Sequence, residues 1–360
     1  ILADMAADEY EVEIAGVATL PTIWPPLQDN KRHKVTVIKA GASRWLSFIS
    51  IWHALSKNNA DIVYICKPRL NSLLPAIIQC RRKLVIDIDD WEYGLTHSHL
   101  HDYGSKLMGL MHVLSTRISE ALSTFIPLRS VSNHFLQKHY KGQVIAHARN
   151  PADFPVLNTN EVIETRSHFG LPTHKKLVLF LGTPHWYKGI PELIEAVKHA
   201  REKYPELHLV IAGLTPLHPS YTLYRQTASD LLGKHFTSLQ YVNWEEHGRM
   251  LSCVDIAVVP QKHMSFTQWG QTPSKIFDAM AAGKPLVVSD IADTKDIVAD
   301  TAWLVAPDSA EAIASALIDI CANPAQAAER AARSKQRFLQ YYSYEQVKPQ
   351  LLKLLAQVKE

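Results

Sequence analysis

Short apolar runs alternate with helix-like segments along the whole chain, and this alternation constrains the fold more than any other feature. In the first half the runs cover residues 12–18, 34–40, 61–67, 83–89 and 124–132. In the second half they cover residues 176–182, 207–213, 239–243, 255–260, 285–290 and 302–307. Runs of this kind suit parallel strands buried between helices. The chain is therefore predicted to be α/β, with two Rossmann-like domains.

The domain junction is predicted near residues 150–162, a stretch rich in Pro, Asn and Asp. We expect an N-terminal domain over residues 1–155, a C-terminal domain over 156–340, and a last helix over 341–360 that returns to the N-terminal domain. The chain opens on ILADMAADEY, which reads as the end of a helix rather than as an opening strand. The first βα unit is therefore predicted to be missing.

Composition places the chain among ordinary globular proteins. It has 47% apolar and 20% charged residues and a formal net charge of +3, which gives no reason to expect nucleic acid as a partner. Residues 1–160 hold 17 Lys and Arg against 14 Asp and Glu, an excess that permits only a peripheral contact with anionic lipid. The segment WLSFISIWHAL, at residues 45–55, is too short to span a membrane and is predicted to be a buried helix.

The cysteines show no metal-site or redox spacing. They are scattered and form no CxxC pair, at Cys66, Cys80, Cys253 and Cys321. Free thiols are the default in a reducing compartment, so the expected location is cytoplasmic, with a possible peripheral position at the inner membrane face.

The segment PSKIFDAMAAGKPLVVSD, at residues 273–290, combines small residues with charged ones. Packing explains most of it, because a helix that begins at Pro273, is capped by Thr272 and ends at Gly283 precedes a buried strand. Packing does not explain Ser274, Lys275 and Asp278. A helix N-terminus that carries hydroxyls and a lysine is also an anion site, so a purely structural role and a phosphate site both stay open here.

Ligands of doubly wound sheets bind at the carboxyl ends of the strands. On the C-terminal domain the candidate residues in those loops are Gly182, Thr183, His185, Lys188, Gly213, Asn243 and Trp244, with Thr272, Ser274 and Lys275, and Asp278 follows in the next helix. The chain contains neither GxGxxG nor GxxxxGK[ST], which argues against a dinucleotide oxidoreductase and a P-loop ATPase.

From about Val144 onward the chain resembles the GT-B glycosyltransferases of family 4, also called group 1. The resemblance lies in FLGTPHWYKG with its following helix and strand, CVDIAVVP, PSKIFDAMAAGKPLVVSD, AWLVAPDSAEAIASAL, the linker ARNPADF and the closing YYSYEQV, all in the family's order. It is weaker before Val144, where KLVIDIDDWE is the best anchor.

The resemblance implies a retaining transfer of a sugar from a UDP- or GDP-linked donor to a glycan or glycolipid acceptor, without a bound metal or other cofactor. The C-terminal domain would hold the donor and the N-terminal domain the acceptor. Lys188 matches the family's phosphate-binding lysine, and Asp278 stands at the second glutamate of its E-x7-E motif, which is implied to hold the ribose hydroxyls. Cations and N–H groups aimed at the leaving diphosphate would lower the barrier.

The sequence departs from the family pattern at three positions. Gly270 occupies the first acidic position of E-x7-E, Thr183 stands where many members have an arginine, and Asp278 is one methylene shorter than Glu. These departures keep two alternatives open: a transferase-like scaffold without catalysis, and a GT-B phosphorylase or epimerase.

Asp89 and Asp90 end an apolar run where the family often carries a histidine, and they are the candidate catalytic residues. The functional interpretation is that Asp89 faces the sugar or orients the acceptor hydroxyl. The structural interpretation is that Asp87 and Asp90 cap the next turn through local hydrogen bonds.

Other candidate residues leave their roles open. The alternating His97, His99 and His101 could share a strand face and bind zinc, but a solvated loop explains them as well, and no metal is predicted. His185 is expected either at a phosphate or sugar or at the surface, and Trp244 either beside the nucleobase or in the core.

Overall fold

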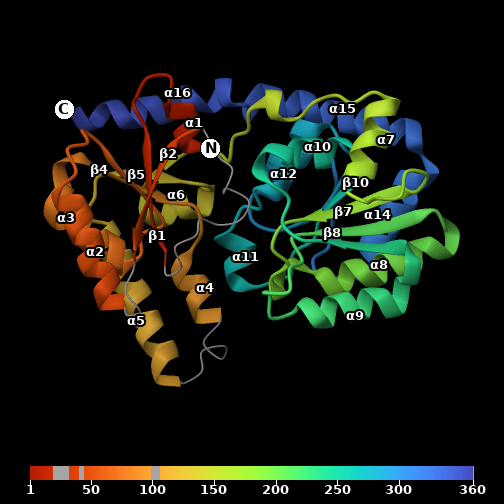
Figure 1. Ribbon diagram of the computed structural model, residues 1–360, viewed down its shortest axis with the longest axis horizontal. Helices are drawn as coiled ribbons and strands as arrows, with labels where there is room; N and C mark the ends of the chain where they lie inside the picture. The colour runs from red at the N-terminus through yellow and green to blue at the C-terminus, as the bar shows by residue number, and fades with distance from the viewer. Residues whose placement is uncertain (19–31, 40–43, 99–105, 360) are drawn as a thin grey trace. The chain divides into compact units, whose positions relative to one another are not determined.

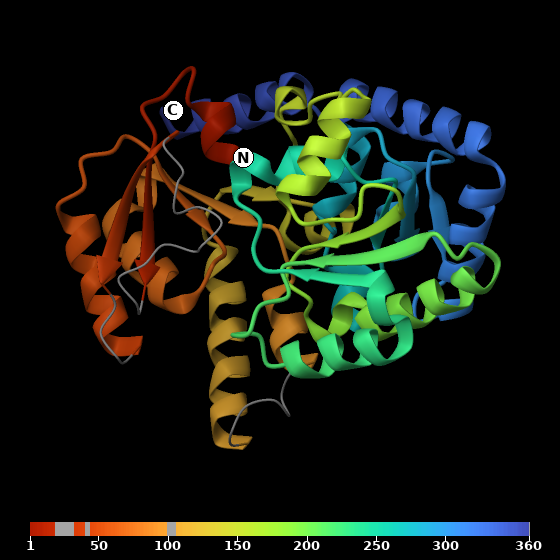
Figure 2. The same cartoon turned by 45° about the vertical axis from the view of Figure 1, so that its right-hand side comes forward.

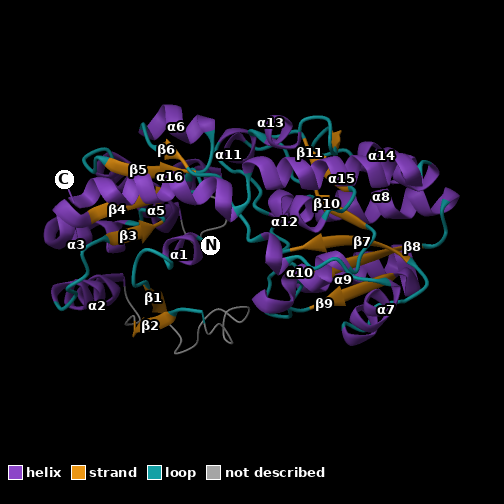
Figure 3. Cartoon of the chain, turned by 90° about the horizontal axis from the view of Figure 1, so that it is seen from above, coloured by secondary structure: helices purple, strands orange, loops and turns teal. Residues whose placement is uncertain are grey.

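The computed structural model describes residues 1–18, 32–39, 44–98 and 106–359, and its two compact units are treated one at a time. The first comprises Ile1–His147, Met264–Thr272 and Val347–Glu360, and the second Ala148–His263 and Pro273–Gln346. In both units, parallel strands lie among helices (Figures 1 and 3). Among the residues described, no helix is long and apolar enough to cross a bilayer.

In its described residues, the first unit contains two parallel sheets. One pairs β1 (Glu13–Ala18) with β2 (Lys34–Lys39). The other has the order β3-β4-β5-β6, formed by Val63–Cys66, Leu84–Ile88, Leu128–Val131 and Gln143–Val144. The helices of this unit are α1 (Leu2–Ala6), α2 (Arg44–Ser56), α3 (Leu70–Cys80), α4 (Glu92–Ser98), α5 (Lys106–Ser123), α6 (His134–Tyr140) and α11 (Ser265–Trp269), and it also holds the end of α16 (Tyr344–Ala356).

The second unit is a six-stranded parallel sheet with the order β12-β11-β10-β7-β8-β9. Its strands are β7 (Lys176–Leu181), β8 (Leu207–Ala212), β9 (Phe236–Leu239), β10 (Ile256–Val259), β11 (Leu286–Ser289) and β12 (Trp303–Val305). If the strands of this unit are numbered 1 to 6 from β7 to β12, their order from the β9 edge is 3-2-1-4-5-6, which is the Rossmann order. The strand order reverses between the first and fourth strands, which are β7 and β10 here.

Helices cover both faces of this sheet because successive residues of each strand point to opposite sides. On β7, Val178 and Phe180 enter one core and Leu177 and Leu179 enter the other. The first core is completed by α8 (Ile190–Lys203), α9 (Tyr221–Leu232) and α14 (Ala310–Ala322). The second is completed by α10 (His247–Ser252), α12 (Lys275–Ala282), α13 (Thr294–Val298) and α15 (Pro324–Tyr341), and α7 (Thr159–His168) packs on α10.

The predicted α/β class and every predicted strand are found, with three local corrections. The strand expected at 239–243 lies at Phe236–Leu239 instead, because the chain leaves the sheet after Leu239. The helix expected from Pro273 begins at Lys275, with Ser274 as its N-cap and no side-chain cap. The helix expected to be buried, α2, is amphipathic: Ile51 is buried, whereas Ile49 is 58% exposed.

Candidate functional site

A cavity of about 210 Å³ lies at the carboxyl ends of β7 and β10. This is the point at which the strand order reverses, where the two loops diverge and open a crevice. Its walls come from the loop after β7, the end of β10 and the first turn of α12, and the polar lining residues are Thr183, His185, Lys188, Ser274, Lys275 and Asp278. The sheet topology thus brings together residues that are almost a hundred positions apart.

Two glycines shape the floor of this crevice. Gly213, directly after β8, has a φ of 106°, and a Cβ on it would overlap the carbonyl of Gly182. A side chain at 213 would therefore push the loop after β7 away from the sheet. Only glycine combines this backbone conformation with such a close approach. Gly213 consequently supports the cavity from behind, whereas Gly182 lines it.

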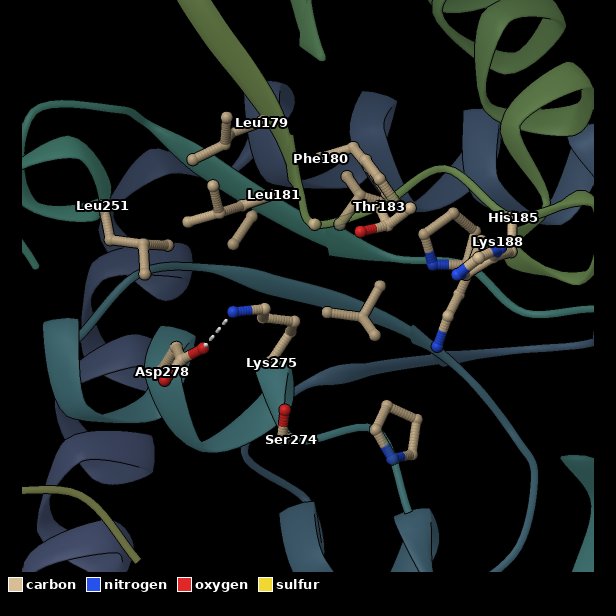
Figure 4. A pocket seen from close by; sticks show the side chains of 16 residues that line it. Leu179, Phe180, Leu181, Thr183, His185, Lys188, Leu251, Ser274, Lys275 and Asp278 are labelled. Atoms are coloured by element: carbon tan, nitrogen blue, oxygen red, sulfur yellow. Dashed lines mark ion pairs between the residues drawn. The ribbon is translucent and has the colours of Figure 1, made fainter. Parts of the chain in front are cut away.

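A buried charge cluster forms the α12 side of the cavity. Arg149 donates from Nε to Oδ1 of Asp278, and only 3% and 1% of the two side chains are exposed. The other carboxylate oxygen, Oδ2, lies 3.2 Å from Nζ of Lys275 and 3.2 Å from Nε2 of His247. Figure 4 shows Lys275 reaching toward Asp278 across the start of α12. One carboxylate therefore faces a guanidinium, a lysine and a histidine.

Burial and charge set the protonation states of this cluster. Burial opposes ionisation of Asp278, but the charges of Arg149 and Lys275 and the hydrogen bond from His247 outweigh burial and hold the pKa of this carboxyl well below its usual range. Burial and the neighbouring Lys275 lower the pKa of His247, so this histidine is neutral near pH 7. Burial also lowers the pKa of Lys275, although Asp278 opposes the shift. With Arg149 and Lys275 charged, the cluster carries a net positive charge, which favours an anion at the cavity wall.

Lys188 and His185 lie at the other end of the cavity (Figure 4). They belong to the loop after β7, where the 3-10 turn Trp186–Lys188 leads into α8. The Nζ of Lys188 lies 5.0 Å from the centre of the Tyr187 ring, and the His185 and Tyr187 rings stack with centroids 5.5 Å apart. The cavity therefore has one lysine at each end, Lys188 and Lys275.

The remaining expected donor-site residues lie outside the cavity lining. Trp244 packs against His247, with ring centroids 5.3 Å apart, and the Arg149 guanidinium lies 6.0 Å from the Trp244 ring. Asn243 precedes the 3-10 turn that holds Trp244. Thr272 is 4% exposed, and its buried hydroxyl makes no hydrogen bond. Trp244 is thus an outer neighbour of the charge cluster.

A second polar cluster lies in the first unit, at the carboxyl ends of β3 and β4. Nζ of Lys67 lies 2.8 Å from Oδ2 of Asp90 and 3.6 Å from both Oδ1 of Asp89 and Oε1 of Glu92. Gln271 donates from Nε2 to Oδ1 of Asp90 at 3.1 Å. Lys67 has a φ of 64°, a left-handed conformation that is uncommon for a residue with a side chain.

These contacts separate the roles of the acidic residues. Asp87 accepts a hydrogen bond from Ser130 on the neighbouring strand β5 at 2.5 Å, so it joins two strands rather than capping the local turn as the structural interpretation had it. Asp90 is held by Lys67 and Gln271. Asp89 is less firmly held, because its buried Oδ1 accepts no hydrogen bond. Burial and the charge of Asp90 raise the pKa of Asp89 to about 7.

Lys67 keeps its charge in this cluster. Burial disfavours the ammonium, but the carboxylates of Asp90, Asp89 and Glu92 raise the pKa of Lys67 well above its usual value. Three carboxyl groups share one lysine, so the cluster is acidic overall. That excess helps to keep Asp89 protonated up to near neutral pH.

The structure explains why position 270 carries no acid. A Cβ on Gly270 would overlap the Cβ of Trp91, and the N–H of Trp91 donates to the carbonyl of Gly270 at 2.9 Å. The antiparallel bridge between Asp90 and Gln271 continues this contact. Segment 264–272 therefore packs on the loop after β4, and any side chain at 270 would disturb it.

The alternating histidines at 97, 99 and 101 do not form a described metal site. His97 is exposed on α4, whereas His99 and His101 lie outside the described residues. Within the described ranges, no group of three or more His, Cys, Asp or Glu residues is placed to hold a metal ion.

Comparison with known proteins gives a consistent result. Residues 162–338 match the family described as glycosyl transferases group 1. The chain is 29% identical over 224 residues to an uncharacterized glycosyltransferase of Methanocaldococcus jannaschii, covering 61% of this chain and 54% of that protein. It is 29% identical over 175 residues to the phosphatidyl-myo-inositol mannosyltransferase of Mycolicibacterium smegmatis, covering 48% and 43%. The chain thus matches about half the length of these curated relatives.

Among solved structures, HepE of Anabaena in complex with UDP and glucose superposes with a TM-score of 0.78 at 16% identity, covering 99% of this chain and 95% of that one. Such a low identity shows the fold alone, which is that of the GT-B glycosyltransferases. Residues 162–338 form a domain of the glycosyl transferases group 1 family. The resemblance seen in the sequence is therefore confirmed.

Three residues of the site were missed by sequence reasoning. In the sequence Arg149 is only part of the linker and nothing marks His247, because both residues reach Asp278 through the tertiary fold. Lys67 carries a usable signal: it ends the apolar run at residues 61–67, and the next run along the chain ends at Asp89. The carboxyl ends of neighbouring parallel strands lie at the same edge of a sheet.

Proposed function

We propose that this protein transfers a sugar from a UDP- or GDP-linked donor to a glycan or glycolipid acceptor, with retention of configuration at the sugar. The observation that carries the proposal is the cavity at the β7–β10 switch point, with a lysine at each end and a net positive wall. HepE, which shares the fold, is described in complex with UDP and glucose. Acceptors of the lipid-linked type are supported by the mannosyltransferase relative.

In this proposal the diphosphate lies between Lys188 and Lys275. Breaking the bond between sugar and phosphate leaves negative charge on the diphosphate, and two fixed cations stabilise that charge as it develops. The backbone N–H groups at the start of α12 add to the same field. The protein's own residues supply this stabilisation, and the proposal includes no metal or other cofactor.

Asp278 is assigned to the ribose. Arg149 holds Oδ1 from the buried side, whereas Oδ2 is shared by Lys275 and His247. When a diphosphate attracts Lys275, Oδ2 loses one of its partners and gains capacity to accept from a ribose hydroxyl. The chain thus replaces the two acids of E-x7-E with one acid fixed by Arg149.

Asp89 is assigned to the acceptor. It is a carboxyl group with a pKa near neutrality, a value suited to taking up the proton of an acceptor hydroxyl. Lys67 and Gln271 act as positioning residues through Asp90. The expected location is the cytoplasm, with a peripheral contact at the inner membrane face where a lipid-linked acceptor would be available.

Calorimetric titration tests the donor site. We expect wild-type protein to bind UDP or GDP, and Lys188→Ala to weaken that binding about tenfold to a hundredfold, as expected for loss of one charge-assisted hydrogen bond. Binding of the free nucleoside should be nearly unchanged in this variant. Lys198→Ala serves as the matched control, because Lys198 is exposed on α8 and does not line the cavity.

Other results would favour the alternatives. Binding of inorganic phosphate without affinity for any nucleoside diphosphate would indicate a phosphorylase. Nucleotide binding without transfer to any acceptor in a screen of glycans and glycolipids would indicate a scaffold without catalysis. Equal loss of nucleoside and nucleotide affinity in Lys188→Ala would show that the diphosphate position is wrong.

A further inference from the structure

Helix α5 carries an apolar stripe that no described part of the chain covers. Its large apolar side chains are 40–67% exposed, at Leu107, Leu110, Met111, Leu114 and Ile118. The spacing of three, four, seven and eleven residues places them on one helical face over three turns. In Figures 1 and 2 the first turns of α5 extend beyond the strands of the sheet that it flanks. Patches of this kind mark interaction surfaces.

Neighbouring elements extend this surface. α3 packs against both α5 and α2, and it exposes Ile78 (57%). The connections β3–α3–β4 and β4–α5–β5 are both crossovers between adjacent parallel strands, and their common handedness places α3 and α5 on the same face of the sheet. The outer faces of the two helices therefore point in the same general direction.

The charges beside the stripe are basic. Lys106 and Arg117 are exposed on α5 itself, and Arg81, Arg82 and Lys83 are exposed directly after α3. The one acid on α5, Glu120, is only 13% exposed. Its carboxylate lies 2.6 Å from Nε2 of His139, 3.0 Å from the hydroxyl of Tyr140 and 3.8 Å from Nη1 of Arg117, which is itself 61% exposed. An approaching anionic surface would thus meet cations without an opposing exposed carboxylate from α5.

We propose that α5 is the membrane-docking element of this protein and lies in the interface of an anionic bilayer with its apolar stripe inserted. A helix with an apolar face and flanking Lys and Arg residues is the form that binds such an interface. The proposal names the surface that makes the peripheral contact suggested above and rests on that part of the proposed function.

Charge argues against a second copy of the chain as the occupant. Two α5 helices packed antiparallel on their stripes would place Lys106 of one copy near Arg117 of the other, and a parallel pair would place Arg117 near Arg117. Neither arrangement brings an exposed acid of α5 to these cations, so like charges would face each other across the contact. Anionic lipid satisfies both the apolar stripe and the cations.

Vesicle sedimentation with the full chain tests the proposal. We expect wild-type protein to bind vesicles of phosphatidylglycerol and phosphatidylcholine, and Leu110→Ser/Leu114→Ser to lower the partition coefficient about tenfold or more, because two inserted leucines are lost. The matched control is Leu217→Ser/Leu223→Ser, which removes two exposed leucines of the second unit (89% and 64% exposed) and should leave the partition unchanged. Lys106→Gln/Arg117→Gln should weaken binding to the anionic vesicles and have little effect on phosphatidylcholine alone.

Three outcomes would overturn the proposal: no binding of wild-type protein to the anionic vesicles, equal losses in the stripe and control variants, or a wild-type dimer in sedimentation velocity that Leu110→Ser/Leu114→Ser abolishes. Titration of the stripe variant with UDP and GDP separates this proposal from the donor site, and the affinities should equal those of wild type. If the protein binds vesicles but neither UDP nor GDP, the membrane-docking role of α5 is retained and the proposed sugar transfer is refuted.

Discussion

Arg149 and Asp278, which are 129 residues apart, form a buried ion pair at the start of α12. The pair ties the segment after β6 to the helix that forms one wall of the cavity. Positive charge exceeds negative charge around this pair, since Lys275 and His247 contact the same Asp278 carboxylate. The position of Lys275 in the cavity therefore depends on a carboxylate that is itself fixed from behind.

Removing the carboxylate of Asp278 should lower the stability of the fold. We expect Asp278→Asn to lower the free energy of unfolding by about 3–5 kcal/mol at neutral pH, because the buried Arg149 and the half-buried Lys275 lose their counter-ion. Arg149→Met should have an effect of similar size, and the double variant should lose less than the sum of the two. Urea denaturation measures all three. Additive losses would show that the pair is not coupled.

The same carboxyl group predicts a pH dependence. Its pKa in the folded protein lies well below the usual value, so its stabilisation is present above the unfolded pKa of about 3.9 and is lost as the pH falls below that value. The stability difference between wild type and Asp278→Asn should therefore be constant from about pH 7 to pH 5 and shrink in stronger acid. A difference that already shrinks near neutral pH would contradict the assigned ionisation.

The contribution of Asp89 to the free energy of unfolding should depend on pH in the opposite direction. Its pKa is raised to about 7, so the stability associated with its protonated form is complete below the unfolded pKa of about 3.9 and is lost as the pH rises toward 7. We expect Asp89→Asn to raise the free energy of unfolding at pH 8 by up to about 4 kcal/mol relative to wild type, with no gain near pH 4. Denaturation at the two pH values measures this, and Asp61→Asn, an exposed carboxyl of the same unit, is the control.

The catalytic assignment of Asp89 has its own test. If the carboxylate takes up the acceptor proton, wild-type turnover should rise with pH through about 7 and then level off. Asp89→Asn should depress turnover about a hundredfold or more and abolish the rise, with donor affinity nearly intact. Steady-state kinetics and calorimetry together measure this. Wild-type turnover in the variant would reduce Asp89 to a structural residue.

Lys67 should affect the pH at which turnover rises, without contacting the substrate. Its ammonium lies beside the carboxyl groups of Asp90 and Asp89 and lowers the pKa of Asp89, so Lys67→Gln should raise the pKa of Asp89 and move the rise in turnover upward by about one pH unit or more. Lys67→Arg, which keeps the charge, should move it far less. An unshifted profile in Lys67→Gln, with only overall stability reduced, would indicate that Lys67 merely supports the fold.

Much of this molecule could be predicted from the sequence because the strands are short, apolar and separated by helices, and because the loops of an α/β sheet converge at one edge. Lys188, Ser274 and Lys275 lie in or beside such loops, whereas the role of Asp278 is implied by the family resemblance, and all four residues line the cavity. Local pattern could not supply the partners of Asp278, because Arg149 and His247 become neighbours only when the sheet forms. It also could not place β9 or the first turn of α12, where tertiary packing rather than a capping side chain decides the boundary.

The contact between Gly270 and Trp91 yields the last prediction. A methyl group at 270 would overlap the Cβ of Trp91, so Gly270→Ala should lower the free energy of unfolding by about 1–3 kcal/mol, the usual effect of overpacking. Gly16→Ala is the matched control, since nothing lies within 4 Å of a Cβ there, and it should be nearly neutral. Trp91→Gly should relieve the overlap, so the double variant Trp91→Gly/Gly270→Ala should show a coupling energy of about 1 kcal/mol or more in denaturation experiments. Gly270→Glu should likewise destabilise rather than restore an E-x7-E site. If Gly270→Ala is as stable as wild type, steric exclusion by Trp91 is not the reason that this chain lacks the first acid.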